Sequence, residues 1–282
     1  MSDISKPIFH NEAKAREWLE RELWPYGPVC PHCGVIGEAT IMNGKSHRPG
    51  LYNCNACRKP FSITVGTLYE RSKIPLNKWL AATHLMMASK KGMSALQIGR
   101  LIGVSKKTAW FLCHRIRESL REIHPEILGG EGKTVEVDES FVGGLEKNKH
   151  RSKRKHKGTG GTGKEAVVAL VERGGRVRSH HMSAAVTAKT LFPILQAHLN
   201  GETLVITDES GAMKKAGNEF GQHESVNHSI GEYVRGDIHT NTIEGYFSIM
   251  QRGIHGTYHH VSQQHLKRYL AEFDFRYNER SA

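Results

Sequence analysis

The sequence of 282 residues predicts a multi-domain protein of mixed α+β and α/β class. Two Cys-x-x-Cys pairs predict a small metal-binding domain in residues 1–72, together with a leading helix between Asn11 and Trp24. Helical periodicity predicts a second domain in residues 73–126. Alternating strand and helix patterns predict a mixed-sheet domain in residues 127–282.

Composition indicates a polyanionic partner. Lys and Arg number 40 against 28 Asp and Glu, which gives a formal net charge of +12, and such an excess favours nucleic acid.

The longest uninterrupted apolar run, Ala166 to Val171, is far shorter than the roughly 20 residues that a membrane span needs. We therefore expect no membrane partner. Residues 1–7 lack the apolar segment of a secretory signal, which predicts a cytoplasmic protein.

The cysteines predict one structural zinc ion. In a reducing compartment, two Cys-x-x-Cys turns can present four thiolates tetrahedrally to a single zinc. A site closed by four thiolates is structural, so we interpret the segment as a zinc ribbon. The alternative is a redox-active Cys-x-x-Cys, which needs one pair only and usually opens a helix in a βαβ unit that is absent here. The expected ligands are Cys30, Cys33, Cys54 and Cys57.

The central segment predicts two helices joined by a glycine turn. Ser94 begins a short helix that ends near Gly103, and Ser105 caps a longer one. Apolar residues at helical spacing predict a buried stripe on the longer helix, formed by Ala109, Leu112, Cys113, Ile116 and Leu120. The other side would carry cations where recognition helices meet DNA, namely Lys106, Lys107 and Arg117. We expect a helix-turn-helix, with an ordinary helical hairpin as the alternative.

The C-terminal segment predicts the element order of a ribonuclease-H-like core. A strand at 134–138 precedes a hairpin, a helix at 187–199 and a strand at 203–208, and the last helix opens at Asn241. The hairpin joins residues 166–171 to residues 176–180 through a Gly-Gly turn.

Three acids lie on or directly beside elements of this predicted core. Asp138 lies on the first strand, Asp208 ends the last strand and Glu244 lies on the final helix. Converging carboxylates repel one another unless cations lie between them, so the cluster predicts two Mg²⁺ or Mn²⁺ ions about 3.5–4 Å apart. Each acid alone has a structural explanation, such as an exposed strand residue, a turn cap or a capping box. The three together favour catalysis.

The nearest rivals to these acids are Glu139, Glu209 and Asp237. Alternation along the strand turns Glu139 toward the face of Val135 and Val137, away from Asp138. We therefore expect Glu139 to lie outside the site.

Several motifs resemble those of a known family. They are Val135–Gly144, His239–Gly245, Gly256–His260 and Phe273–Asn278. From Cys30 onward, the chain is similar to DDE-type bacterial insertion-sequence transposases with an N-terminal zinc ribbon. The resemblance implies that Asp138, Asp208 and Glu244 form the catalytic triad, that Asn241 lies beside the site, and that the enzyme cleaves at terminal inverted repeats and joins 3′ ends to target DNA. We expect a homodimer or higher oligomer on DNA in the bacterial nucleoid.

One position departs from the family pattern. Relatives usually carry a lysine seven residues after the glutamate, where this chain has Gln251. Ser248 and Gln251 share the helical face of Glu244, so we expect position 251 to contact DNA near the metals. Glutamine can donate hydrogen bonds but supplies no positive charge, and Arg252 is the adjacent cation.

A basic loop follows the first strand of the C-terminal segment. Residues 145–164 are rich in glycine and cations, among them Lys153, Arg154 and Lys155. We expect these side chains to clamp DNA phosphates beside the acidic site. The alternative is a solvated loop without a ligand.

The leading hypothesis is a metal-dependent DNA transposase. The first alternative is a DNA-binding regulator, derived from a transposase, whose core no longer cuts; Gln251 is the residue that favours it. The second is a structure-selective nuclease that does not join strands.

Overall fold

The computed structural model describes residues 3–144, 148–154, 161–227 and 230–280. The chain divides into two compact units. Unit 1 comprises Met1–Ser89 and Met93–Ser119, and unit 2 comprises Lys90–Gly92 and Leu120–Ala282. The three-domain division expected from the sequence is a finer one and stays a prediction. None of the helices in the described ranges has the length and apolarity that a membrane span requires.

The helices of unit 1 begin at residues whose side chains cap them. Asn11 accepts a hydrogen bond from the Lys14 N–H, and Ser94 accepts one from the Gln97 N–H, which satisfies donors that the first helical turn leaves open. Gly103 ends the second of these helices at φ 64°, a conformation that favours glycine. The elements are η1 (Pro7–Phe9), α1 (Glu12–Leu23), α2 (Leu76–Ala88), α3 (Ala95–Ile102) and α4 (Lys106–Ser119).

The two helices on either side of the glycine turn, α3 and α4, approach each other closely. A Cβ atom added at Gly99 would lie 3.0 Å from the Ala109 Cβ atom and 3.2 Å from the Val104 carbonyl oxygen. Of the predicted stripe, Ala109, Leu112, Cys113 and Ile116 are buried. Spacing therefore predicted the helix boundaries and four of the five residues of the stripe, with Leu120 only half-buried.

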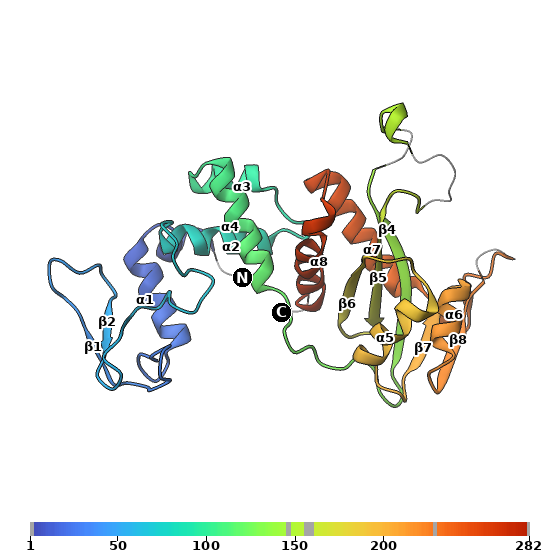
Figure 1. The fold of residues 1–282 in the computed structure, drawn as a ribbon, viewed down its shortest axis with the longest axis horizontal. Coiled ribbons are helices and arrows are strands. Elements are labelled where there is room, and N and C mark those ends of the chain that lie inside the picture. The colour runs from blue at the N-terminus through green and yellow to red at the C-terminus, as the bar shows by residue number, and fades with distance from the viewer. Residues whose placement is uncertain (1–2, 145–147, 155–160, 228–229, 281–282) are drawn as a thin grey trace. The chain divides into compact units, whose positions relative to one another are not determined.

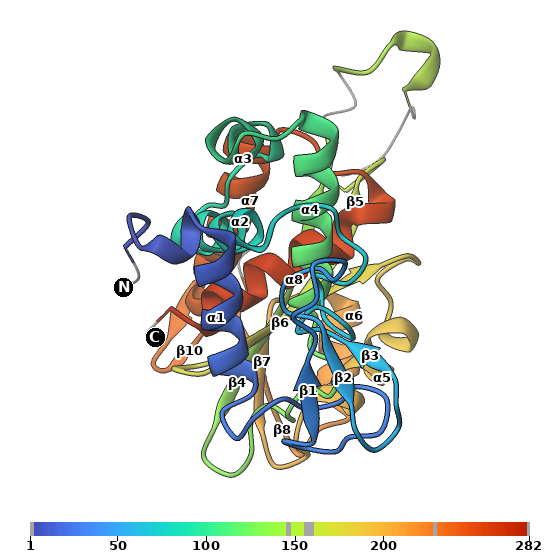
Figure 2. The same cartoon turned by 90° about the vertical axis from the view of Figure 1, so that its left-hand side faces the viewer.

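Helix α1 contributes to the helical core of unit 1, and its Glu20 also accepts a hydrogen bond from the Tyr52 hydroxyl of the cysteine-rich segment. Ala15 and Leu19 join one apolar cluster with residues of α2, α3 and α4, among them Trp79 and Ile98. The cysteine-rich segment has its own small core around Phe61, with the half-buried ring of Trp24 packed edge-on against it. Figure 2 shows its short strands side by side: β1 (Ala39–Ile41), β2 (Tyr52–Cys54) and β3 (Pro60–Phe61).

Unit 2 is built on a five-stranded mixed sheet. Its strands are β4 (Thr134–Val142), β5 (Glu165–Glu172), β6 (Val177–Met182), β7 (Leu204–Thr207) and β8 (Gln222–Ser225). The spatial order is β6-β5-β4-β7-β8. The first three strands are antiparallel neighbours, and β7 and β8 run parallel to β4. A mixed sheet is therefore confirmed, and β4 lies at its centre.

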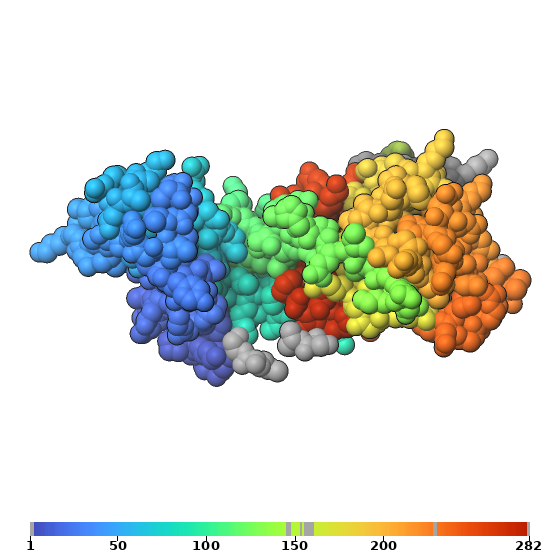
Figure 3. All heavy atoms as spheres, turned by 90° about the horizontal axis from the view of Figure 1, so that it is seen from below, coloured from blue at the N-terminus to red at the C-terminus, as the bar shows by residue number. Residues whose placement is uncertain are grey.

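Helices cover both faces of this sheet (Figure 1). On one face, α5 (Ala188–His198) and α6 (Gly211–Gly217) pack over Val135 and Val137. On the other, α7 (Asn241–Gly253), η5 (Ile254–Tyr258) and α8 (Gln263–Asn278) pack over Val167 and Ala169. The surfaces of α5 and α6 adjoin in the space-filling view, in yellow and orange (Figure 3). The alternating apolar residues of β4 and β5 thus serve two cores.

Side chains of α8 cover the backbone of the outermost strand, β6. Asp274 accepts hydrogen bonds from the Ser179 N–H at 2.9 Å and the Ser179 hydroxyl at 2.7 Å, and also from the Tyr246 hydroxyl. Asn278 accepts from the Val177 N–H and donates to the Val177 carbonyl oxygen. An uncovered edge strand can pair with another chain. The motif Phe273–Asn278 therefore has a structural role here, which is to fix α8 and to close this edge.

Replacing Asp274 should destabilise unit 2. Asp274→Ala leaves the Ser179 N–H and the Tyr246 hydroxyl without their acceptor, and we expect it to lower the free energy of unfolding by about 1–3 kcal/mol. Urea unfolding followed by circular dichroism measures this loss. Glu279→Ala, at the exposed end of the same helix, is the control and should change it by less than about 0.5 kcal/mol. Equal effects of the two variants would contradict the role given to Asp274.

Candidate functional site

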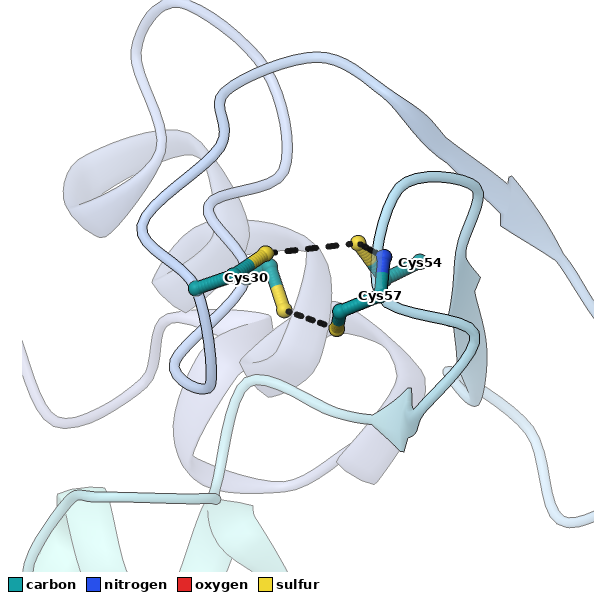
Figure 4. A group of neighbouring side chains, drawn as sticks. Cys30, Cys54 and Cys57 are labelled. Atoms are coloured by element: carbon teal, nitrogen blue, oxygen red, sulfur yellow. Dashed lines mark hydrogen bonds between the residues drawn. The ribbon is translucent and has the colours of Figure 1, made fainter.

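Four cysteines meet between the two loops of the ribbon. The Sγ atoms of Cys30 and Cys57 are 3.7 Å apart, as are those of Cys33 and Cys54. All four sulfur atoms lie within 4.8 Å of one another, and Figure 4 shows the thiols of Cys30, Cys54 and Cys57 turned toward a common centre. Tetrahedral ligands 2.3 Å from a zinc ion are about 3.8 Å apart. The donor set and its spacing therefore fit zinc.

The pKa values of two thiols in the cluster shift in opposite directions. The Val35 N–H acts to lower the pKa of Cys33, but burial and the neighbouring thiols raise it. Burial acts to raise the pKa of the Cys30 thiol, but N–H groups of His32 and Cys33 point at its sulfur and lower that pKa to about 6. A thiolate is the form that binds metal. The fifth cysteine, Cys113, is buried in the helical core of unit 1 and is not part of the cluster.

A second group of possible metal ligands lies at one end of the sheet in unit 2. Parallel strands β4 and β7 pair as far as Val137 and Thr207, so the next residues, Asp138 and Asp208, leave the pairing at the same edge. Carboxylate oxygens of Asp138, Glu139 and Asp208 all lie within 4.8 Å of one another. The sequence predicted the first and third of these residues to lie together.

The prediction that Glu139 lies away from the site was wrong. Alternation holds along β4, but β4 continues to Val142 whereas β7 ends at Thr207. Strand β7 therefore does not pair with β4 at residues 138 and 139. As a result, Asp208 can approach side chains on both faces of β4. The Glu139 Oε2 atom is buried and has no hydrogen-bond partner among the described residues. The sequence feature that could have identified Glu139 is its position directly after an acid that follows the paired part of a strand. Alternation of side chains between the two faces of the strand does not take this position into account.

Burial and neighbouring acids raise the pKa values of Asp138 and Glu139. Burial and, next, the charge of Asp208 raise the pKa of Asp138 to about 8, with smaller contributions from Glu139 and Glu244. Burial and Asp208 raise the pKa of Glu139 to about 7. Because their folded pKa values are raised, these groups contribute stability to the metal-free fold that is fully present below about pH 4 and is lost progressively as the pH rises to about 7 to 8. A bound cation would reverse that loss.

Glu244 approaches the group from helix α7. Its carboxylate accepts a hydrogen bond from the Thr240 hydroxyl at 3.0 Å, and it is near enough to Asp138 to raise that residue's pKa. It is not within 4.8 Å of the other three carboxylates as a group. The capping box that could have explained Glu244 does not form. Helix α7 begins at Asn241 with Thr240 as its N-cap, and the Asn241 N–H donates to His239 Nδ1.

The side chain of Gln251 makes hydrogen bonds to strand β4 of the same chain. Its Nε2 atom donates to the Ser140 Oγ atom and to the Phe141 carbonyl oxygen, each at 3.0 Å. Position 251 therefore ties α7 to the end of β4, two residues beyond Asp138. The neighbouring Arg252 and the first residue of the helix, Asn241, are exposed.

Of the cations predicted on helix α4, two are exposed and one is not. Lys106 and Lys107 are exposed at the start of the helix. Arg117 is 1% exposed, so the prediction that it shares their open face was wrong. Arg117 follows the buried Cys113 by four residues, which places it one turn further along the edge of the apolar stripe.

The structure describes part of the basic loop. The Arg154 Nε atom donates to the Lys149 carbonyl oxygen at 2.9 Å, and Arg154 is exposed. The side chain of Lys153 and the whole of Lys155 lie outside the described residues.

The four-cysteine cluster and the acidic group on a mixed sheet define a zinc-ribbon protein with a carboxylate site. The family described as ISXO2-like transposase domain matches residues 127–278, and the family described as transposase zinc-ribbon domain matches residues 10–60. The first match spans more than half of the chain. This chain therefore belongs to the ISXO2-like family of insertion-element transposases.

Relatives agree with this assignment. The chain is 29% identical over 278 residues to a protein of Halobacterium salinarum described as an uncharacterized protein in transposable element ISH50, and the match covers 95% of this chain and 91% of the relative. Both the ribbon and the mixed-sheet domain lie within that span.

Two solved structures show slight similarity. One is the simian T-cell lymphotropic virus intasome in complex with PP2A regulatory subunit B56 gamma, at 13% identity and a TM-score of 0.28, with 66% of this chain and 62% of that chain covered. The other is the Mos1 strand transfer complex, at 11% identity and a TM-score of 0.22, with 69% and 77% covered. The match thus spans less than two thirds of the first structure's chain, and similarity this slight carries no argument about fold.

Replacing one cysteine of the cluster should release zinc. We expect Cys54→Ser to reduce the zinc content from one ion per chain to nearly none and to unfold the ribbon, because closed zinc sites supply much of the folding free energy of small domains. Elemental analysis after dialysis measures the zinc content. Cys113→Ser, at a buried cysteine outside the cluster, should keep the zinc. A zinc-loaded Cys54→Ser protein would contradict the assignment.

Binding of divalent metal to the acidic group should release protons. Because Asp138 and Glu139 titrate at about 8 and about 7 in the metal-free protein, an ion must displace protons below those values. We expect the affinity for Mn²⁺ to rise from about pH 6 to about pH 8, by up to about tenfold per pH unit for each proton displaced. Calorimetric titration in buffers of different ionisation enthalpy counts the protons. An affinity independent of pH over this range would be inconsistent with binding at these two carboxylates.

Proposed function

We propose that this protein is a DNA transposase that cuts the ends of an insertion element and joins them to target DNA. The observation that carries the proposal is the convergence of Asp138 and Asp208 at the shared end of β4 and β7, with Glu244 on the adjacent helix. The family of the chain and its net charge of +12 support it.

We infer that the core is ribonuclease-H-like. Counted from β4, the strand order is 3-2-1-4-5, with the first three strands antiparallel and the last two parallel to the first. The acids lie on the first strand, after the fourth strand and on the helix that follows the sheet. This arrangement supports the inference made from the element order of the sequence.

The acidic group fits divalent cations. Carboxylates at this spacing suit Mg²⁺ or Mn²⁺, and the Glu139 Oε2 atom is a buried acceptor that has no hydrogen-bond partner in the described part of the chain. Asp138, Asp208 and Glu244 would hold two such ions, and we include Glu139 beside them. When bound, the ions supply the charge that activates a water or a 3′ hydroxyl and stabilises the leaving oxygen.

The residues around the acids have separate tasks in this reaction. Asp138 must be ionised to bind metal, and burial together with the charge of Asp208 keeps it protonated near neutral pH until cations arrive. The Glu139 N–H donates to the Asp138 Oδ1 atom, and the Ser210 N–H donates to the Asp208 Oδ1 atom, at 2.7 and 3.0 Å. These bonds orient one oxygen of each carboxylate.

Exposed cations are the proposed DNA contacts. Lys106 and Lys107 at the start of α4 suit the phosphates and base edges of a terminal inverted repeat, as in a helix-turn-helix. Arg154 of the basic loop and Arg252 of α7 would contact phosphates nearer the acids, with Asn241 beside them. Two DNA ends require two sites, so we propose a homodimer or higher oligomer on DNA. A chromosomal substrate implies action at the bacterial nucleoid in the cytoplasm.

One observation favours a second function, a DNA-binding regulator that no longer cuts. Gln251 replaces the lysine usual in relatives, and both protons of its amide nitrogen are directed to Ser140 and Phe141. Position 251 therefore offers DNA no positive charge. The same experiment that tests the transposase separates it from this regulator and from a nuclease.

Strand transfer tests the proposal. The zinc-loaded protein, a donor DNA that carries the repeats flanking its reading frame, and Mg²⁺ should give joined products. Asp138→Asn should lower cleavage by at least about a thousandfold, because the metal loses a charged ligand, while binding to the repeats stays within about twofold. Asp237→Asn, an exposed acid outside the cluster, is the control and should cleave normally.

The remaining outcomes identify the alternatives. Binding without nicks supports the regulator, and nicks without joining support the nuclease. Normal cleavage by Asp138→Asn would contradict the assigned site.

A further inference from the structure

A second acid of strand β4 lies on the same face as Asp138 but makes a different set of contacts. Glu136 precedes Asp138 by two residues, so both side chains leave the strand toward helix α7. Glu136 is 0% exposed. A fully buried carboxylate is costly unless it is paired and hydrogen-bonded, and the contacts of Glu136 show what compensates for its burial.

The Glu136 carboxylate receives donors from two directions. Arg173, in the turn after β5, donates from its Nε atom to Glu136 Oε1 at 2.7 Å. From the first turn of α7, the Thr242 hydroxyl donates to Oε1 and the Ile243 N–H donates to Oε2, each at 2.9 Å. Both oxygens of one carboxylate thus connect the central strand to the start of α7.

Helix α7 depends on this carboxylate for its N-terminal cap. Thr240, its N-cap residue, makes no capping hydrogen bond with its side chain; its hydroxyl donates instead to Glu244. The first turn of a helix leaves N–H groups without partners and carries partial positive charge. Glu136 supplies the missing acceptor and a negative charge from another part of the chain.

The segment that leads into α7 is fixed by the same ion pair. Arg173 also donates to the carbonyl oxygens of Asp237 and His239, at 2.6 and 2.8 Å. The strand β10 (Ile238–His239) therefore cannot shift without breaking bonds to the partner of Glu136.

We propose that Glu136 is a positioning residue that sets the place of Glu244 relative to Asp138. Glu136 holds the Ile243 N–H, and Glu244 is the next residue, while Asp138 is two residues along the strand from Glu136. A single buried carboxylate thereby fixes the distance between two acids that belong to different elements. This inference rests on the proposed function, in which Glu244 and Asp138 hold the same metal ions.

A double-mutant cycle on Mn²⁺ affinity tests the proposal. The variants are Glu136→Gln, Glu244→Gln and the double variant, each in the zinc-loaded full chain, and calorimetric titration with MnCl₂ gives the dissociation constants. Glu136→Gln removes the charge but keeps the size of the side chain. We expect it to weaken Mn²⁺ binding by about 10- to 100-fold, as is usual when a residue that supports a metal ligand is replaced. In the Glu244→Gln background it should have little further effect, because its action passes through Glu244.

Two further variants keep the test independent of global stability. Thr242→Val removes one donor from the α7 side and leaves the pair of Glu136 with Arg173 intact, so it should weaken Mn²⁺ binding in the same direction and by less. Glu172→Gln alters another paired carboxylate of the same sheet, which bonds to Lys133 and to the Gly129 N–H, and these partners, within the described ranges, lie outside α7. It should leave the Mn²⁺ affinity unchanged even if it lowers the melting temperature.

The outcomes distinguish this proposal from the proposed function. If Glu244→Gln weakens Mn²⁺ binding and Glu136→Gln either has no effect or adds its full effect to that of Glu244→Gln, the positioning role is overturned and the metal site stands. If Glu244→Gln leaves Mn²⁺ binding unchanged, the metal role of Glu244 is overturned, and the positioning role with it.

Discussion

Repulsion among carboxylates at the shared end of β4 and β7 is the constraint on which unit 2 depends. Asp138 and Asp208 follow the last paired residues of two parallel strands, so the backbone hydrogen bonds of the sheet force them together. Burial and, next, the charge of Asp208 raise the pKa of Asp138 to about 8. The fold holds an unfavourable arrangement that divalent cations would relieve. The buried strands and the two apolar cores stabilise the fold and offset the free energy that this repulsion costs.

The ribbon and unit 2 hold their proposed metal ligands together in different ways. The ribbon has only a small apolar core around Phe61, so its loops depend on ligands to one ion for their order. Unit 2 has a sheet between two cores, and its acids depend on buried bonds such as those of Glu136 to Ile243 and Arg173. The ribbon site would thus form with its metal, whereas the acidic site is built before metal arrives.

Local patterns predicted much of this structure. The Cys-x-x-Cys spacing located the ribbon site, helical period and caps located α3 and α4, and strand patterns located β4 to β7 but not the edge strand β8. Side chains whose positions depend on contacts between distant segments of the chain were missed or misplaced. Alternation put Glu139 outside the acidic group because it carries no information on where the neighbouring strand stops, and helical period put Arg117 on an open face. The roles of Glu136 and Asp274 depend on contacts between residues some hundred positions apart, which no local pattern reports.

The occupancy of the acidic site by metal is the most direct test of this account. Crystals of the zinc-loaded protein soaked in Mn²⁺ and measured at the manganese absorption edge should show two anomalous peaks about 3.5–4 Å apart, between the carboxylates of Asp138 and Asp208 and in reach of Glu244. Manganese bound elsewhere, with these carboxylates empty or bridged by water alone, would contradict the central claim that they converge to hold divalent ions.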